Sequence, residues 1–373
     1  MAPPRGTEVV VRVAAAGVNG GCETFRCRGE HFFARNREAT DGFAVGAEGA
    51  GVVVAVGGDV AGVAARNAAW AEDADGAPVS VGDVVAFVGG AFAEYVTLPS
   101  PERALRVATS SDANRADARE AAALYISGTI ALCALYHRAD TQPGERVVVT
   151  AAAGGTGQFA VQLALLRGCH VIATCGSERK RAALEALCAH LIDHASGVGF
   201  ARVCQGSAGG SLRFVESRGA DIRGALRGAL DAAGGDADVA YEGVGGHMRD
   251  ACMDVLCPKG GRLLVIGYIS EYPHNDAPAA SADGPVPASE ELFWSSADVS
   301  LPGGARVLGN VWGNDVAGGR RDVYALWRSG DLKVLVDDVG GDAGGGADVA
   351  ERARRAVHCM LGGGTVGKAV LRP

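Results

Sequence analysis

Residues 147–164 have the composition and spacing of a phosphate-binding turn. An apolar run at 147–150 leads into Gly154-Gly155-Thr156-Gly157, and a helical apolar pattern begins directly afterwards. Glycines let the backbone approach a pyrophosphate closely, and a helix N-terminus offers unpaired N–H groups to the anion. The spacing is not the strict Gly-x-Gly-x-x-Gly, and a glycine-rich turn also occurs in other α/β proteins. The order of strand, turn and helix favours a dinucleotide site.

The end of the next predicted strand indicates which dinucleotide binds. An NAD site usually carries Asp or Glu there, about 20 residues on, to accept the ribose hydroxyls. Here the strand ends in the neutral residues Gly176 and Ser177. Glu178 follows and can point outward at a helix start. Three cations come next: Arg179, Lys180 and Arg181. Such cations would attract a 2′-phosphate. A solvated helix face is the alternative, but Lys180 is one of only four lysines, so we predict NADP(H), with its 2′-phosphate attracted by Lys180 and by Arg179 or Arg181.

Two kinds of element surround these residues. Short β-branched runs with glycine turns predict a small β-rich domain of roughly 100 residues before the turn. From residue 115 onward, apolar strands alternate with helical patterns, which predicts a parallel sheet covered on both faces. The predicted strands of this sheet are 146–150, 168–174, 237–241, 261–267 and 305–312. Residues 196–235 and 273–289 look inserted, and 342–347 are expected to form a surface loop.

Composition excludes several classes of protein. The 373 residues carry 35 basic and 43 acidic side chains, and the net charge of −8 argues against binding nucleic acid. No run of about 18 apolar residues predicts a membrane span. The ten cysteines lack Cys-x-x-Cys spacing and lie in apolar runs, which favours reduced, buried thiols. No targeting signal is visible, so we expect a cytoplasmic protein, with the peroxisome or another organelle as the alternative.

Three blocks resemble the medium-chain dehydrogenase/reductase superfamily over nearly the full chain: Ala16-Gly17-Val18-Asn19, residues 81–96, and residues 151–164. The resemblance implies a GroES-like β-rich substrate domain at 1–137, a Rossmann doubly wound parallel sheet at 138–312, and a return to the substrate domain at 313–373. It also implies no metal site. Zinc-dependent members place Cys and Gly-His-Glu where this chain has Asn19 and Gly46-Ala47-Glu48, so the closest branch is that of zinc-free enone and quinone reductases.

The same resemblance assigns NADP contacts residue by residue. Two positions have a small residue in place of a larger polar one, Gly243 for Ser and Thr365 for Asn, and His194 replaces Tyr as an adenine-stacking ring. Thr129 is expected to hold the nicotinamide carboxamide, with a helix cap as its alternative role. The complete predicted cofactor set is Thr129, Gly154, Gly155, Thr156, Gly157, Gly176, Ser177, Lys180, His194, Gly243, Ile266, Tyr272, Asn310, Val311, Trp312 and Thr365.

The implied reaction is hydride transfer from NADPH to the activated double bond of an α,β-unsaturated ketone, such as a 15-oxo-prostaglandin. Charge then builds on the carbonyl oxygen, which needs hydrogen-bond donors. The candidate donors are Tyr272 and Asn19, although a structural ring and a turn residue are the alternatives. Quinone reduction and a non-catalytic NADPH-binding scaffold also remain open. We further expect a homodimer that pairs through an exposed edge at residues 305–312, with an interior or loop-covered strand as the alternative.

Overall fold

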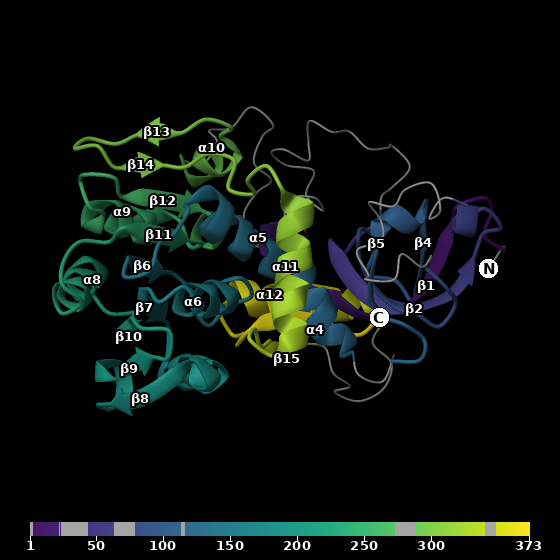
Figure 1. The fold of residues 1–373 in the computed structure, drawn as a ribbon, viewed down its shortest axis with the longest axis horizontal. Coiled ribbons are helices and arrows are strands. Elements are labelled where there is room, and N and C mark those ends of the chain that lie inside the picture. The colour runs from purple at the N-terminus through teal and green to yellow at the C-terminus, as the bar shows by residue number, and fades with distance from the viewer. Residues whose placement is uncertain are drawn as a thin grey trace. The chain divides into compact units, whose positions relative to one another are not determined.

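The computed structural model describes residues 3–21, 23, 44–62, 79–112, 116–272, 288–339 and 348–373. The chain divides into two compact units, Met1–Ile126 with Val336–Pro373, and Ser127–Leu335 (Figure 1). The sheet of the first unit has the order β15-β16-β1-β2-β3-β5, and β4 also pairs with β1. Its strands are β1 (Val9–Gly17), β2 (Glu48–Val56), β3 (Val84–Val88), β4 (Tyr95–Leu98), β5 (Ala104–Ala108), β15 (Val336–Asp338) and β16 (Lys368–Leu371).

Alternation builds the core of this first unit. Val9, Val11 and Val13 lie two residues apart on β1, so they share one face of the strand. They pack in one cluster with Phe87 of β3 and with α12 (Val349–Leu361). A second helix of the unit, α4 (Ala118–Ala123), is capped by Asp117. The predicted β-rich domain is therefore confirmed, and it includes the last strand of the chain.

The second unit contains a nine-stranded sheet of order β13-β14-β12-β11-β6-β7-β10-β9-β8. The strands from β14 to β10 are parallel to one another, while β13 and β9 run antiparallel to their neighbours. The bounds are β6 (Arg146–Val149), β7 (His170–Cys175), β8 (Ile192–Ser196), β9 (Val203–Gly206), β10 (Ser211–Glu216), β11 (Val239–Glu242), β12 (Arg262–Val265), β13 (Val299–Ser300) and β14 (Arg306–Val307).

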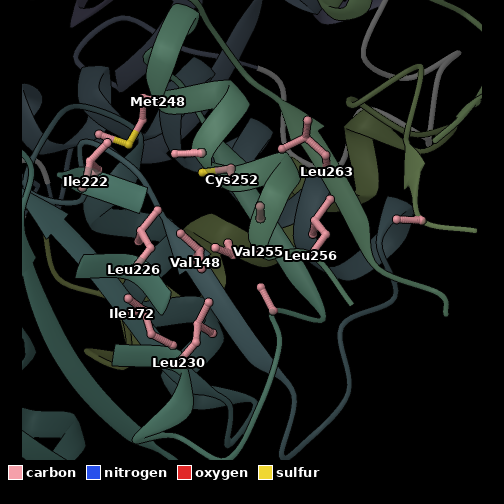
Figure 2. Close-up of a cluster of buried hydrophobic side chains, with 14 of the residues drawn as sticks. Val148, Ile172, Ile222, Leu226, Leu230, Met248, Cys252, Val255, Leu256 and Leu263 are labelled. Atoms are coloured by element: carbon pink, nitrogen blue, oxygen red, sulfur yellow. The ribbon is translucent and has the colours of Figure 1, made fainter. Parts of the chain in front are cut away.

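Helices cover both faces of this sheet. On one face, Leu226 and Cys252 pack with Val148, Ile172 and Leu263 of the strands (Figure 2). On the other face, α6 lies against β6 and β7 and is buried along almost its whole length. The helices of the unit are α5 (Thr129–Leu132), α6 (Gly157–Leu166), α7 (Glu178–Leu187), α8 (Ile222–Asp231), α9 (Gly246–Val255), α10 (Ala288–Trp294) and α11 (Val316–Ser329). The doubly wound fold is confirmed.

One helical run, Ala118–Arg138, carries the chain from the first unit into the second. It includes the π-helical segments Leu124–Gly128 and Cys133–Arg138 on either side of α5. Among the described helices it is the one with the length and composition of a membrane span, and 78% of its most apolar window is buried inside the protein. Burial of this kind is what the core helix of a globular unit shows.

The unit boundaries differ from the expected domain boundaries. Residues 127–137 and 313–335 belong to the second unit, because α5 packs against α11. A Cβ at Gly319 of α11 would lie 2.4 Å from the Cys133 sulfur, so glycine permits this close approach. α5 and α11 therefore pack together within the second unit. The expected boundaries at 137 and 312 had placed these two helices outside it.

The expected insertion at 196–235 is partly wrong. β10 and α8 are regular parts of the sheet, because β10 pairs with β7 in parallel register from Ser211↔His170 to Glu216↔Cys175. The additional elements are the antiparallel strands β8 and β9, which extend the sheet beyond β10. Of the predicted loop at 273–289, residues 273–287 lie outside the described residues. The predicted loop at 342–347 lies wholly outside them.

The expected edge strand at 305–312 is also wrong. Only Arg306–Val307 is extended, and β13 pairs with its outer side (Figure 1). Val307 is 1% exposed and belongs to the core. Among the described strands, β13 is therefore the edge at this end of the sheet, and Val299 on it is 39% exposed.

Candidate cofactor and substrate site

The turn between β6 and α6 is as tight as its glycines predicted. A Cβ at Gly157 would lie 2.5 Å from the carbonyl oxygen of Ala151, and one at Gly154 would lie 2.9 Å from the same atom. Ala151 itself has a φ of 45°, a strained value for a residue with a side chain. α6 begins at Gly157, and no side chain caps it. Its first N–H groups are therefore the donors that a phosphate at this position would receive.

Two buried hydroxyls lie near the predicted cofactor residues. Tyr241 on β11 is 1% exposed; burial raises the pKa of its phenol, and a hydrogen bond with the Thr156 side chain of the turn lowers it. Thr129 is fully buried and lies inside a continuous helical run, so the helix-cap alternative is wrong. The Thr129 hydroxyl has no hydrogen-bond partner among the described residues. Buried polar atoms are nearly always paired, so this hydroxyl points to a ligand or water.

A buried carboxylate organises the backbone after β11. Glu242 accepts N–H bonds from Val244 at 2.7 Å and Gly245 at 3.1 Å, and a hydroxyl bond from Thr150 at 3.2 Å. Thr150 in turn accepts the N–H of Gly243 at 2.8 Å. Burial raises the pKa of Glu242 to about 7, and its donors lower it. Glu242 was not among the predicted site residues, and it holds residues 243–245 at the end of the strand.

The structure brings Gly243, Ile266 and Tyr272 together at the carboxyl ends of β11 and β12. A Cβ at Gly267 would lie 3.4 Å from the Gly243 carbonyl oxygen and 3.6 Å from the Tyr272 hydroxyl. Tyr272 also packs edge-on against Tyr268, with ring centroids 5.0 Å apart. The Ile266 N–H donates to the Glu242 carbonyl at 2.6 Å. These three predicted residues therefore form one group.

Residues 310–312 follow β14 at the same carboxyl edge. Asn310 has a φ of 46°, which asparagine tolerates better than most residues, and its N–H donates to Ser295 at 2.8 Å. Val311 is buried and Trp312 is half-buried in the turn. In an open parallel sheet, ligands bind outside the carboxyl ends of the strands, so this turn has the placement that the prediction requires.

The neutral end of β7 carries a cation that the sequence analysis missed. The position of a Cβ on Gly176 is 3.2 Å from Nε of Arg218 and 3.5 Å from Oγ of Ser217, both of which follow β10. Ser177 caps α7 by accepting the Lys180 N–H. Gly176 therefore lies between Arg218 on one strand end and the helix that carries Lys180. Arg218 becomes identifiable only when β10 is seen to pair with β7.

Arg181 does not share this role. Its guanidinium lies 2.7 Å from Glu178 and 2.5 Å from Glu185, and its side chain is 8% exposed. Glu178 is the exposed residue expected at the helix start, and the bond from Arg181 lowers its pKa. Of the three cations after Glu178, Arg181 is thus committed to a structural ion pair.

His194 is not brought to the cofactor group. It lies on β8 and pairs with Gln205 of β9. Gln205 pairs with Ser211 of β10, and Ser211 pairs with His170 at the start of β7. Gly176 follows the other end of β7. Three strand spacings and the length of β7 separate His194 from Gly176 by roughly 20 Å. The structure therefore does not place His194 beside Gly176, and its contact with the adenine stays a prediction.

Asn19 belongs to a buried polar cluster in the first unit. Its amide Nδ2 donates to Glu48 at 2.8 Å, and its Oδ1 accepts from the Lys368 ammonium at 2.7 Å. Lys368 also lies 2.5 Å from Glu48, and both side chains are almost fully buried. The structure places Thr365 in the same unit, buried just before β16. Lys368 was not among the predicted site residues. Lysine is scarce in this chain, so a lysine within an apolar strand was a signal that could have identified it.

Glu23 is a second buried carboxylate beside Asn19. Its two oxygens accept the N–H groups of Asn19 at 2.8 Å and of Ala47 at 3.0 Å. Burial raises the pKa of Glu23 to about 7, and these bonds together with Lys368 lower it. The cluster therefore holds one cation and two carboxyl groups, one of which takes up a proton near neutral pH.

The residues of this cluster do not suit a divalent cation. Asn19 and Ala47 stand where the resemblance places thiolate and imidazole ligands, and the Lys368 ammonium already contacts Asn19 and Glu48. Within the described parts of the chain, no group of three or more His, Cys, Asp or Glu side chains has the arrangement of a metal site. That the protein works without zinc stays a prediction.

Removal of the cations beside Gly176 should affect NADPH but not NADH. We expect Lys180→Ala and Arg218→Ala each to weaken NADPH binding by about 1.5–3 kcal/mol, the scale of a hydrogen bond to a charged group. NADH lacks the 2′-phosphate, so its affinity should stay nearly unchanged. Fluorescence titration of both cofactors measures this, with exposed Lys259→Ala as the control. Equal losses for NADPH and NADH would contradict the assignment.

Glu23 should make the free energy of unfolding depend on pH. Its pKa is about 7 in the folded protein and near the ordinary value of 4.5 in the unfolded chain, so the folded state binds the proton more tightly. The stability from this proton is present below pH 4.5 and is lost as pH rises through about 7, a decline of about 3 kcal/mol. Urea unfolding between pH 5 and 8 should show a smaller decline in Glu23→Gln than in the wild type or in exposed Glu94→Gln. An unchanged decline in Glu23→Gln would refute this.

Comparison with known families agrees with both units. Residues 5–108 match the family described as Alcohol dehydrogenase GroES-like domain, and residues 155–286 match the family described as Zinc-binding dehydrogenase. A mycobacterial protein solved in complex with NADPH has a similar fold, with a TM-score of 0.64 at 21% identity, over 100% of this chain and 94% of that chain.

Two curated proteins are similar at the level of sequence. Prostaglandin reductase-3 of Bos taurus is 32% identical over 331 residues, which are 88% of this chain and 73% of the relative. A probable quinone oxidoreductase of Leishmania amazonensis is 33% identical over 276 residues, covering 72% of this chain and 64% of the relative. The chain therefore belongs to the medium-chain dehydrogenase/reductase superfamily, in the branch that includes prostaglandin reductase-3.

Proposed function

We propose that this protein is a zinc-independent reductase that uses NADPH to reduce the activated double bond of an α,β-unsaturated ketone. The observation that carries the proposal is the end of β7, where Gly176 lies beside Arg218 and before Lys180. Two cations and no carboxylate at this point favour a 2′-phosphate over a free ribose hydroxyl. The similarity to prostaglandin reductase-3 supports the choice of an enone, of which a 15-oxo-prostaglandin is one example.

When bound, NADPH supplies a hydride. The backbone of residues 154–157 would hold its pyrophosphate, and Arg218 and Lys180 would hold its 2′-phosphate. Gly243, Ile266 and Tyr272 would line the nicotinamide end. Thr129 has a buried hydroxyl without a partner among the described residues, which suits a bond to the carboxamide.

The substrate carbonyl oxygen becomes more negative as the double bond is reduced, so donors at that oxygen stabilise the transition state. Tyr272 offers a phenolic O–H. Asn19 offers the second N–H of its amide, because Glu48 accepts one of the two. After the hydride reaches the β-carbon, the α-carbon of the enolate takes a proton, which water or the ribose hydroxyl of the cofactor would supply. Neither Tyr272 nor Asn19 then needs to give up its own proton.

Quinone reduction is the second candidate reaction, and the similarity to the Leishmania amazonensis protein favours it. A quinone carbonyl would need the same donors and the same cofactor residues. A scaffold that binds NADPH without turnover is the non-catalytic alternative. The net charge of −8 favours a small-molecule substrate over nucleic acid. We propose a cytoplasmic location, with an organelle such as the peroxisome as the alternative.

A substrate panel distinguishes these functions. We expect the purified protein to oxidise NADPH with α,β-unsaturated ketones, measured by the loss of absorbance at the nicotinamide band, and to prefer them to quinones and saturated ketones. Chelators should leave the rate intact, and metal analysis should find well under one zinc per chain, since Asn19 and Ala47 replace the expected ligands. Binding of NADPH without turnover on any compound would favour the scaffold, and chelator-sensitive turnover would refute zinc independence.

We further propose a homodimer that pairs through β13. Val299 on this edge strand and the nearby Trp294 are 39% and 45% exposed, and an unpaired apolar edge is stabilised by a two-fold mate. Sedimentation should give about 76 kDa, twice the chain mass of 37.8 kDa. Val299→Asp should yield monomers of unchanged fold, whereas Val198→Asp beyond the opposite edge should not. A concentration-independent wild-type monomer would overturn the dimer.

A further inference from the structure

The Lys368 ammonium is almost completely enclosed in the first unit. Its side chain is 3% exposed, and that of Glu48 is fully buried. Burial of an ammonium is costly unless it is paired and hydrogen-bonded, and Lys368 reaches Glu48 at 2.5 Å and Asn19 at 2.7 Å. A buried ion pair of this kind is weak evidence of a role in stability alone, so its contact with Asn19 is the informative feature.

The two charges determine which way the Asn19 amide points. An ammonium can only donate a hydrogen bond, and a carboxylate can only accept one. Oδ1 of Asn19 therefore faces Lys368, and Nδ2 faces Glu48. The reversed amide would place N–H groups against the ammonium and an oxygen against the carboxylate. One Nδ2–H remains after the bond to Glu48, and its direction is fixed.

We propose that Lys368 is a positioning residue for substrate reduction. Its ammonium contacts the side chains of Glu48 and of Asn19, and Asn19 stands where zinc-dependent members place a cysteine ligand. It holds the Asn19 amide so that the remaining Nδ2–H donates to the substrate carbonyl oxygen. The proposal rests on the proposed function and adds a residue that no sequence motif had selected.

Glu48 connects the same amide to the long helix. While Oε1 contacts Asn19 and Lys368, Oε2 accepts the N–H of Ile126 at 2.6 Å. Ile126 lies in the π-helical segment Leu124–Gly128, and Thr129 follows three residues later in the same helical run. A shift of Glu48 after loss of its cation would therefore disturb the amide and this helical turn together.

The test compares the turnover of four proteins. Lys368→Met removes the ammonium, and Glu48→Gln/Lys368→Met removes both charges, so that no buried carboxylate is left unpaired if the single variant fails to fold. Exposed Lys259→Met is the matched control. We expect kcat with an enone to fall on the order of 10²-fold in both Lys368 variants, the scale for losing an oxyanion donor. The Kd for NADPH should change less than about twofold, and Lys259→Met should match the wild type.

A second comparison separates positioning from general stability. If Lys368 acts through Asn19, adding Glu48→Gln/Lys368→Met to Asn19→Ala should lower kcat no further than Asn19→Ala alone. If the residues act independently, the fold-losses in kcat of the two sets of substitutions would multiply. Wild-type kcat in Glu48→Gln/Lys368→Met, or multiplicative losses with Asn19→Ala, would overturn the proposal while leaving the proposed function intact. A wild-type protein that oxidises no NADPH with any enone or quinone would overturn the proposed function, and this proposal with it.

Discussion

A buried carboxylate that must be paired organises the polar interior of each unit. Glu48 in the first unit collects an ammonium, an amide and a backbone N–H, while Glu242 in the second collects two backbone N–H groups and a hydroxyl. An unpaired charge at either position would cost several kcal/mol, so the surrounding elements are constrained to supply these donors. In the first unit one of these donors comes from β16, which pairs with β1 and carries Lys368.

The cofactor site follows from the parallel sheet of the second unit. Parallel strands present all of their carboxyl ends at one edge, so residues as distant in the chain as Gly154, Gly176, Gly243 and Tyr272 can serve one ligand. The added strands β8 and β9 leave this edge unchanged because they extend the sheet beyond β10. The strand beside β7 is β10, and Arg218 follows it next to Gly176.

The first unit matches a known family but has its own set of polar side chains inside. Residues 5–108 match the family described as Alcohol dehydrogenase GroES-like domain, and Asn19 and Ala47 cannot supply a thiolate and an imidazole to a metal ion. The positive charge beside Glu48 belongs to a lysine on a neighbouring strand. The Lys368 ammonium donates hydrogen bonds to Asn19 and Glu48, whereas a metal ion would bind the substrate oxygen directly. Under the proposed mechanism, the substrate oxygen accepts a hydrogen bond from the Asn19 amide.

Local patterns in the sequence were sufficient for the two-unit fold, the phosphate turn and the neutral end of β7, because each depends on residues adjacent in the chain. Tertiary structure alone decided the partners that come from distant segments. It showed that β10 and not β8 lies beside β7, that β13 covers β14, and that Lys368 meets Asn19 across 349 positions of the chain. Strand order and burial bring such residues together. Neither can be deduced from the spacing of residue types along the chain, because the contacting residues are far apart in sequence.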